Sequence, residues 1–201
     1  MTLIIIAFTV LVSLLAFNRQ TVFDKLKFNA FYILKEKEWH RFLSYGLIHA
    51  DWIHLLINMF VLYSFGDIVE TIFTHYFGAK GYVYFFLLYA GGIAFSTLYD
   101  FGKQKENIFY NAVGASGAVS AVVFSSIILF PHGKIFLFFI PIGIPAPVFG
   151  ILYLVYSAYM AKKGNSIIGH SAHFWGAIYG IAFTIAINPE FLKLFLKYLG
   201  G

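Results

Sequence analysis

Long uninterrupted apolar runs fill most of this chain and are separated only by short polar or glycine-containing turns. Because a bilayer core of about 30 Å takes about 20 apolar residues per helix, 201 residues have room for roughly six crossings and little else. The runs lie at approximately residues 2–17, 48–65, 82–99, 112–130, 146–160 and 172–187. We therefore expect an all-α polytopic membrane protein, with residues 1–201 forming a single membrane domain.

The composition excludes several classes of protein. Only 11% of the residues are charged, against about 25% in a soluble domain, which is too few to cover a water-soluble surface. The chain has no cysteine, so a disulfide framework, a cysteine-ligated metal and a thiol nucleophile are excluded. The net charge of +5 lies in the loops and favours contact with anionic lipid headgroups over nucleic acid.

Three segments outside the regular runs have their own signatures. Residues 18–41 mix lysines with apolar residues at roughly helical spacing, which is typical of an interfacial segment. Prolines and a glycine within residues 134–145 predict an extended loop, with the fifth helix beginning near Ala146. The sequence Asn-Pro-Glu at 188–190 has the order of a helix start, so a short amphipathic helix is expected over residues 191–199.

Polar residues inside the apolar runs are the most informative ones, because burying them unpaired in lipid costs several kcal/mol. They gather where the second, fourth and sixth runs begin. Consecutive spans alternate in direction, so these three ends lie on the same membrane face. The residues are His49, His54 and Asn58 in the second run, Asn111, Gly114, Ser116 and Gly117 in the fourth, and His170, His173, Gly176 and Gly180 in the sixth.

Their types suit the activation of a serine. His54 and Asn58 are at i and i+4, so both project from one helix face, as two donors to one oxyanion must. The small residues around Ser116 leave its backbone accessible. Two glycines beyond His173 form a face on which the sixth helix could pack closely, bringing His173 to Ser116 as a general base.

Each element also has a purely structural interpretation. A Gly-Ala-Ser-Gly sequence in a membrane helix is more often a packing seam than a nucleophile. An intramembrane histidine can simply donate to a backbone carbonyl, and Asn58 alone would usually join two helices. The convergence of three such elements, each with the residue type that one reaction needs, favours a catalytic site.

Five stretches also match a known family in order and spacing. They are the Trp/Arg segment 38–42, the segment 49–59 with His-xxx-Asn, the Gly-xxx-Glu of 66–70, the Gly-Ala-Ser-Gly of 114–117, and the Ala-His-xx-Gly-xxx-Gly of 172–180. Together they resemble the motifs of the rhomboid intramembrane serine proteases. The resemblance implies a six-helix rhomboid-like bundle with an interfacial first loop.

The resemblance also implies the reaction and its residues. It indicates hydrolysis of peptide bonds in or near transmembrane segments of membrane-protein substrates, through an acyl-enzyme, with no cofactor and no metal. Ser116 would be the nucleophile and His173 the general base. The oxyanion would be bound by His54, Asn58 and the backbone amide of Ser116. Supporting roles would fall to His49, Gly114, Gly117, Gly176 and Gly180.

Two further features near the expected site are a departure from the family pattern at Ser120 and the loop before the sixth run. The fourth residue after the nucleophile is Ser120, where the family often has an aromatic that packs on the catalytic imidazole. Either another aromatic such as Phe174 or Trp175 replaces it, or the imidazole is held less firmly. The loop of residues 161–171, which contains Gly164 and Gly169, could act as a lid over the substrate entrance.

The charges bear on orientation. The family's basic core places its N-terminus in the cytoplasm, and in that orientation ten of the fourteen Lys and Arg residues lie outside, against the positive-inside rule. We follow the resemblance and expect a bacterial-type inner or plasma membrane.

Three other functions compete. A rhomboid-like protein that binds membrane helices without cleaving them would be expected to lack Ser116 or His173, and both are present. A small transporter fits the histidines, but Asp67 and Glu70 lie at the end of the second run rather than within the membrane. A metalloprotease is disfavoured because no His-Glu-xx-His sequence occurs.

Overall fold

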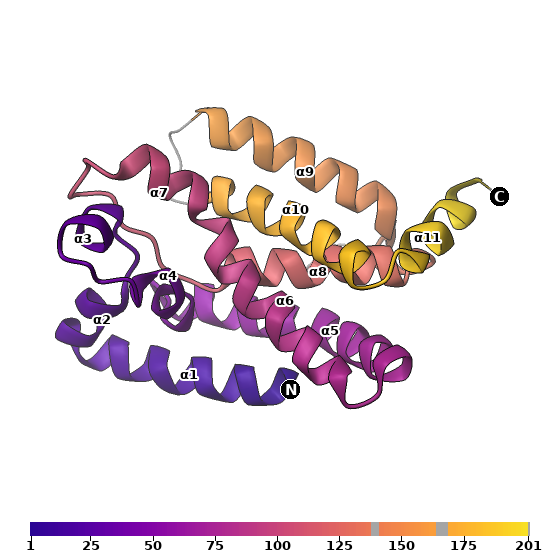
Figure 1. Cartoon of the computed structure of the whole chain (residues 1–201), viewed down its shortest axis with the longest axis horizontal. Coiled ribbons are helices and arrows are strands. Elements are labelled where there is room, and N and C mark those ends of the chain that lie inside the picture. The colour runs from indigo at the N-terminus through magenta and orange to yellow at the C-terminus, as the bar shows by residue number, and fades with distance from the viewer. Residues whose placement is uncertain (138–140, 164–168, 201) are drawn as a thin grey trace.

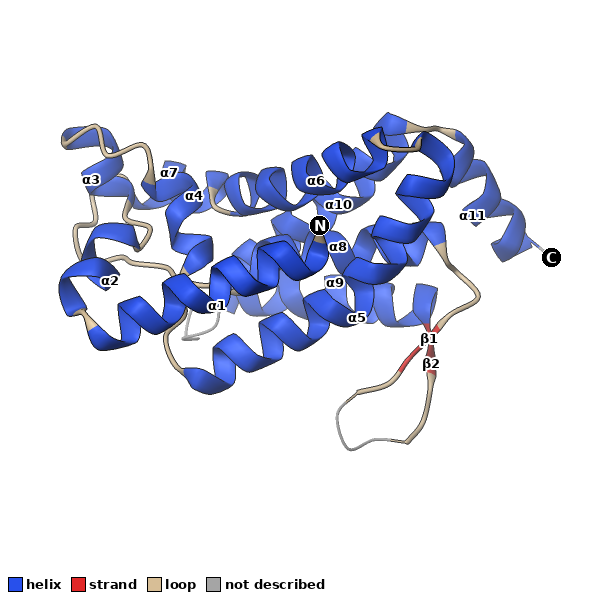
Figure 2. Cartoon of the chain, turned by 90° about the horizontal axis from the view of Figure 1, so that it is seen from below, coloured by secondary structure: helices blue, strands red, loops and turns tan. Residues whose placement is uncertain are grey.

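The computed structural model describes residues 1–137, 141–163 and 169–200, which form a bundle built almost entirely of helices (Figures 1 and 2). The elements, in chain order, are α1 (Thr2–Asn18), α2 (Gln20–Leu26), α3 (Ala30–Lys35), α4 (Arg41–Ser44), the 3-10 turn η1 (Tyr45–Leu47), α5 (Trp52–Phe77), α6 (Lys80–Ser96), α7 (Leu98–Gln104), α8 (Ser116–Leu129), β1 (Lys134–Ile135), β2 (Ile144–Pro145), α9 (Ala146–Lys163), α10 (His170–Ile187) and α11 (Glu190–Gly200).

Six of these helices, α1, α5, α6, α8, α9 and α10, overlap the six apolar runs. Among the described residues, α5 and the stretch Lys80–Gln104 are long and apolar enough to cross a membrane, and α10 with α11, bent by 111°, makes a third if the pair counts as one span. Helices α1 and α8 are apolar but shorter. The chain is an integral membrane protein, and the count of six crossings stays a prediction.

Helix α5 differs from the expected span at both ends. It starts at Trp52 rather than at residue 48, because the side chain of Asp51 accepts a hydrogen bond from the backbone N–H of His54 at 2.7 Å and caps the helix. It then continues past residue 65 to Phe77. Glu70, taken as part of a polar end, instead accepts hydrogen bonds from the backbone N–H and the hydroxyl of Thr2 on α1, at 2.7 and 2.6 Å.

Helix α8 is the centre of the bundle and packs against α5, α6, α9 and α10. Every residue from Gly117 to Ile128 is buried. The helix begins at Ser116 and not at residue 112, because Ala112 is in an extended segment whose backbone pairs with that of Phe28. Its many small side chains explain the central position, since they let the surrounding helices approach its backbone closely.

Helices α8 and α10 meet along a seam of small residues, as the spacing of the glycines predicted. A Cβ atom on Gly176 would overlap the carbonyl oxygen of Gly117, and one on Gly180 would overlap that of Ala121. Further along, the hydroxyl of Thr184 donates to that of Ser125 at 2.7 Å. The seam therefore fixes how far apart the two helices lie.

Substitution of Gly180 by alanine is expected to destabilise the protein by about 1–3 kcal/mol, as overpacking does, because the new methyl group must push α10 off the α8 backbone. Thermal unfolding of the purified protein in detergent measures the effect. Gly102→Ala on α7 is the matched control, since its Cβ would meet nothing within 4 Å. Equal melting temperatures for the two variants would contradict the close contact.

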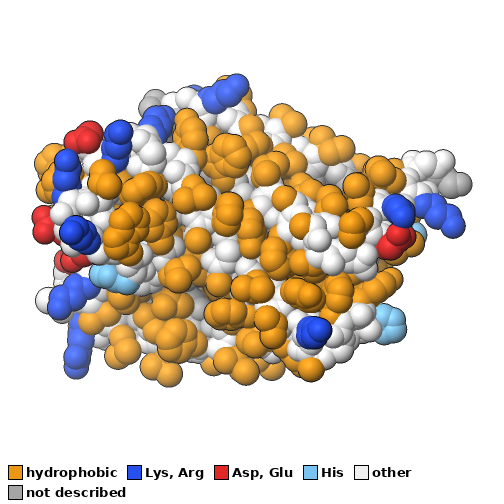
Figure 3. All heavy atoms as spheres, in the orientation of Figure 1, with side chains coloured by type: hydrophobic (Ala, Val, Ile, Leu, Met, Phe, Trp, Pro, Cys, Tyr) orange, Lys and Arg blue, Asp and Glu red, His pale blue; other side chains and the backbone are white. Residues whose placement is uncertain are grey.

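The first loop, expected from its helical spacing to be an interfacial segment, contains short helices and is held together by one buried arginine. The guanidinium of Arg41 donates to the carbonyl oxygens of Asp24 and Lys27, each at 2.8 Å, and to the carboxylate of Glu38 at 2.5 Å. Basic side chains gather at the end of the molecule formed by α2, α3 and α7 (Figure 3). The N-terminal ends of α5, α8 and α10 point toward that same end (Figure 1).

The connections around α9 and α11 agree with the sequence. Strands β1 and β2 pair antiparallel, with Lys134 opposite Pro145, and α9 begins at Ala146. Helix α11 starts where the side chain of Asn188 accepts a hydrogen bond from the backbone N–H of Glu190 at 3.1 Å. Each boundary follows from a local signal, a proline or a capping side chain.

Candidate active site

Ser116 is the first residue of α8 and is half-buried. The first backbone N–H groups of a helix have no acceptor within the helix, so this end carries partial positive charge. With 14 residues, α8 is only about 21 Å long, less than the bilayer core. Ser116 is therefore at the very end of its helix and not several residues inside it.

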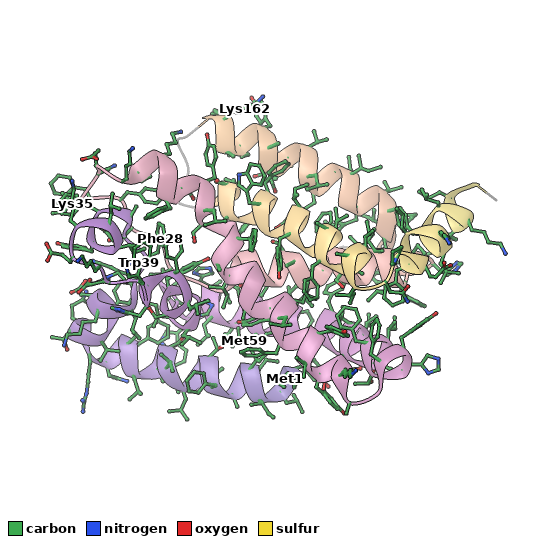
Figure 4. The ribbon with its side chains drawn as sticks, viewed as in Figure 1. Met1, Phe28, Lys35, Trp39, Met59 and Lys162 are labelled. Atoms are coloured by element: carbon green, nitrogen blue, oxygen red, sulfur yellow. The ribbon has the colours of Figure 1, made fainter. Side chains whose placement is uncertain are left out.

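The segment leading to Ser116 is held from several sides. Gly114 has a φ of 109°, a left-handed conformation that favours glycine, and its N–H donates to the carbonyl oxygen of Tyr45 at 3.0 Å. Phe28 of the first loop, labelled in Figure 4, exchanges backbone hydrogen bonds with Ala112 at 2.9 and 3.1 Å. The first loop thus helps to set the position of the N-terminal end of α8.

His49 is fully buried and belongs to this support. Its Nε2 accepts the N–H of Ala115 at 3.4 Å, and its Nδ1 lies 3.0 Å from the hydroxyl of Ser13, which itself donates to the carbonyl oxygen of Leu47. Since the Ser13 proton is used at Leu47, the ring carries its own proton on Nδ1. His49 therefore links α1 to the residue just before Ser116.

His54 lies directly against the same segment. A Cβ on Gly114 would overlap Cε1 of the His54 ring and lie 2.8 Å from its Nε2. The His54 and His49 rings meet edge to face at 5.0 Å between centroids. One turn further along α5, Asn58 is buried and its side-chain N–H₂ donates to the carbonyl oxygen of His54 at 2.9 Å, which uses one of its two protons.

His173 is half-buried on α10 at the start of the glycine seam. A Cβ on Gly117 would lie 3.3 Å from the carbonyl oxygen of Ala172, so the residues next to Ser116 and next to His173 are in close contact. No hydrogen bond joins Ser116 to His173 in the part of the chain that the structure describes. In substrate-free enzymes such bonds are often long and tighten only when substrate binds.

The residue that sequence reasoning missed is Tyr153 on α9. Its ring stacks on the His173 ring, with centroids 6.3 Å apart and planes at 27°. The aromatic expected there was Phe174 or Trp175. The expectation was wrong for Trp175, because its ring stacks on that of Tyr99 with centroids 6.2 Å apart. The ring of Phe174 contacts that of Trp175, so nothing supports its stacking on His173. Ser120 signalled a missing aromatic, but nothing in the local sequence pointed to α9.

Two further expectations concern the surroundings of the site. The lid expected over residues 161–171 includes Gly164, and 164–168 lie outside the described residues. Within the described ranges, no group of three His, Asp or Glu side chains is placed to hold a metal ion.

The model of the rhomboid domain matches residues 36–190, well over half of the chain. The chain belongs to the rhomboid family. It is 32% identical over 152 residues to RHOMBOID-like protein 12, mitochondrial, of Arabidopsis thaliana, and 29% identical over 148 residues to Rhomboid protein 1, mitochondrial, of Saccharomyces cerevisiae.

These alignments cover 71% and 72% of this rhomboid chain but only 45% and 41% of the two relatives, so the chain spans less than half of their length. Both relatives are named as mitochondrial proteins. The similarity therefore gives no support to the bacterial-type membrane expected from the sequence.

Proposed function

We propose that this rhomboid chain is an intramembrane serine endopeptidase that cleaves membrane-protein substrates in or near their transmembrane segments. The observation that carries the proposal is the convergence of three elements. Ser116 lies at the N-terminal end of α8, His54 lies against Gly114 just before it, and α10 presents His173 next to the closest α8–α10 contact. A candidate nucleophile, a candidate base and hydrogen-bond donors are thus grouped around the N-terminal end of α8.

The reaction would proceed through an acyl-enzyme. The imidazole of His173 takes the proton of the Ser116 hydroxyl as its oxygen attacks the scissile carbonyl. The resulting oxyanion accepts hydrogen bonds from the amide of Ser116 and from the side chains of His54 and Asn58. His173 then gives its proton to the departing amine, and in the second half it activates the water that releases the acid product and frees Ser116.

The alternative is a rhomboid protein that binds membrane helices without cleaving them. That function needs neither a serine at the end of α8 nor a histidine facing it. The elaborate support of the segment before Ser116, from Ser13 through His49 to the amide of Ala115, suits a site that must hold a nucleophile in place. We therefore favour the protease.

The proposal includes the arrangement in the membrane. We propose that α1, α5, α6, α8, α9 and α10 are the six crossings of one domain over residues 1–201. The first loop and α11 would lie at opposite interfaces. Substrates would be other membrane proteins, and cleavage needs no cofactor or metal. The orientation with the N-terminus inside follows the family, and a protease-protection assay that finds Met1 outside would overturn it.

Substituting His54 or Asn58 by alanine is expected to lower kcat by about 10²- to 10³-fold each, the usual loss for one oxyanion donor. Cleavage of a model transmembrane substrate by the purified protein in proteoliposomes measures this loss. The melting temperature should change little for His54→Ala, since its ring makes no hydrogen bond within the described residues. His75→Ala, exposed near the end of α5, is the control. Full activity in both site variants would remove the oxyanion assignment.

A further inference from the structure

Tyr153 stands out because its ring contacts the ring of His173 from α9, a helix that carries none of the residues assigned to catalysis. Its ring lies nearly parallel to that of His173, at 27°. It also contacts Phe124 of α8 and Phe149 of its own helix, with ring centroids 5.6 and 5.7 Å away. The Tyr153 ring therefore fills the space between α8 and the His173 imidazole.

The hydroxyl of Tyr153 has a specific partner. It lies 2.7 Å from the hydroxyl of Ser120, which is buried on α8. Ser120 follows Ser116 by four residues, so the two serines share one face of α8. The hydrogen bond thus ties the phenol one turn below the nucleophile, at the level where the ring meets His173.

Helix α9 is at the edge of the bundle, and few of its residues hold it there. Its buried residues are Ala146, Gly150 and Ser157. At Gly150, one turn before Tyr153, a Cβ would lie 3.3 Å from Ile127 and 3.4 Å from Phe124, so α9 rests closely on α8 there. Much of the rest of α9 is exposed. The position of the Tyr153 ring accordingly depends on how α9 docks.

We propose that Tyr153 is the positioning residue of the general base, and that the Ser120–Tyr153 hydrogen bond makes the alignment of His173 depend on α9 being docked on α8. This inference rests on the proposed protease function. The ring restricts rotation of the imidazole, so that one nitrogen stays directed at the Ser116 hydroxyl. A substrate or lipid that displaces α9 then switches the base out of alignment without touching the dyad.

The first test separates the ring from the hydroxyl. Tyr153→Ala should lower kcat by about 10- to 100-fold, the scale of a small misplacement of a reacting group, and leave KM within about twofold. Tyr153→Phe keeps the ring and should lose only about two- to tenfold, the scale of one hydrogen bond. Ser120→Ala removes the same hydrogen bond, so it should lower kcat by the same factor as Tyr153→Phe. The double variant should have no lower kcat than either single variant. Tyr159→Ala, an exposed tyrosine on α9, is the control.

A double variant that moves the aromatic ring from α9 to α8 tests the role of α9 docking directly. Ser120→Tyr combined with Tyr153→Ala moves the ring from α9 to α8 and should regain most of the kcat that Tyr153→Ala loses. It should also make activity independent of α9 docking. Gly150→Leu, which must push α9 away from Ile127, should lower kcat about tenfold in the wild-type background and have no further effect on the transposed variant.

The results separate this inference from the proposed function. If the wild-type protein neither cleaves a transmembrane substrate nor reacts with a fluorophosphonate, the protease proposal fails. If the wild-type reaction depends on Ser116 while Tyr153→Ala keeps wild-type kcat, or raises only KM, the positioning role alone is overturned. If Tyr153→Phe loses as much kcat as Tyr153→Ala, the ring is not what aligns the base, and the proposal also fails.

Discussion

Replacing Ser116 with alanine is expected to lower the rate of substrate cleavage by about 10⁵- to 10⁶-fold, because it removes the hydroxyl that forms the acyl-enzyme. The loss should fall on kcat, since the small side chain adds little to substrate binding. The fold should persist, because the serine side chain makes no hydrogen bond within the described residues. Cleavage of a model transmembrane substrate in proteoliposomes, followed over hours, measures the residual rate.

Ser64→Ala is the matched control for this variant. Ser64 is on α5, where its hydroxyl donates a hydrogen bond to the carbonyl oxygen of Phe60 in its own helix. It should keep wild-type kcat and the same melting temperature as Ser116→Ala. If Ser116→Ala cleaved at even a tenth of the wild-type rate, the serine mechanism would be wrong and the non-cleaving, helix-binding function would regain support.

Replacing His173 with alanine is the second large effect expected. Without the imidazole the Ser116 hydroxyl keeps its proton during attack, so kcat should again fall by about 10⁵- to 10⁶-fold. Because the two residues act as a unit, the double variant Ser116→Ala/His173→Ala should be no slower than either single variant. Loss of the ring also removes the partner of Tyr153, so a modest decrease in melting temperature is expected.

Two other histidines provide the control for His173→Ala and the result that would contradict its role. His132→Ala changes a ring that contacts Tyr198 and should leave the rate unchanged. His170→Ala removes the ring that meets His173 edge to face at 6.0 Å and tests the alternative base. If His170→Ala abolished cleavage while His173→Ala retained it, the general base would be His170.

Local signals predicted much of the fold. Prolines placed the start of α9 at Ala146, a capping asparagine placed the start of α11, and the glycine spacing on α10 predicted its close contact with α8. The length of α5 could not be predicted in the same way. Glu70 looked like a polar helix end, but its partner is Thr2 on α1, a contact between residues 68 apart in the chain.

The site residues with local sequence motifs could also be predicted, whereas contacts between distant parts of the chain could not. Ser116, His54 and His173 could be proposed because each is in a short motif whose spacing matches its chemistry. Tyr153 could not, because its partner Ser120 is 33 residues away and on another helix. The role of His49 was only partly predicted, since its contact with Ser13 depends on how α1 packs.

The most direct measurement is reaction of the purified, folded protein with a fluorophosphonate probe, followed by mass spectrometry of the modified peptide. The account predicts one adduct per chain, on Ser116, with no adduct in Ser116→Ala and only slow labelling in His173→Ala. An adduct on another residue, or no adduct in a protein that still cleaves a transmembrane substrate, would contradict it.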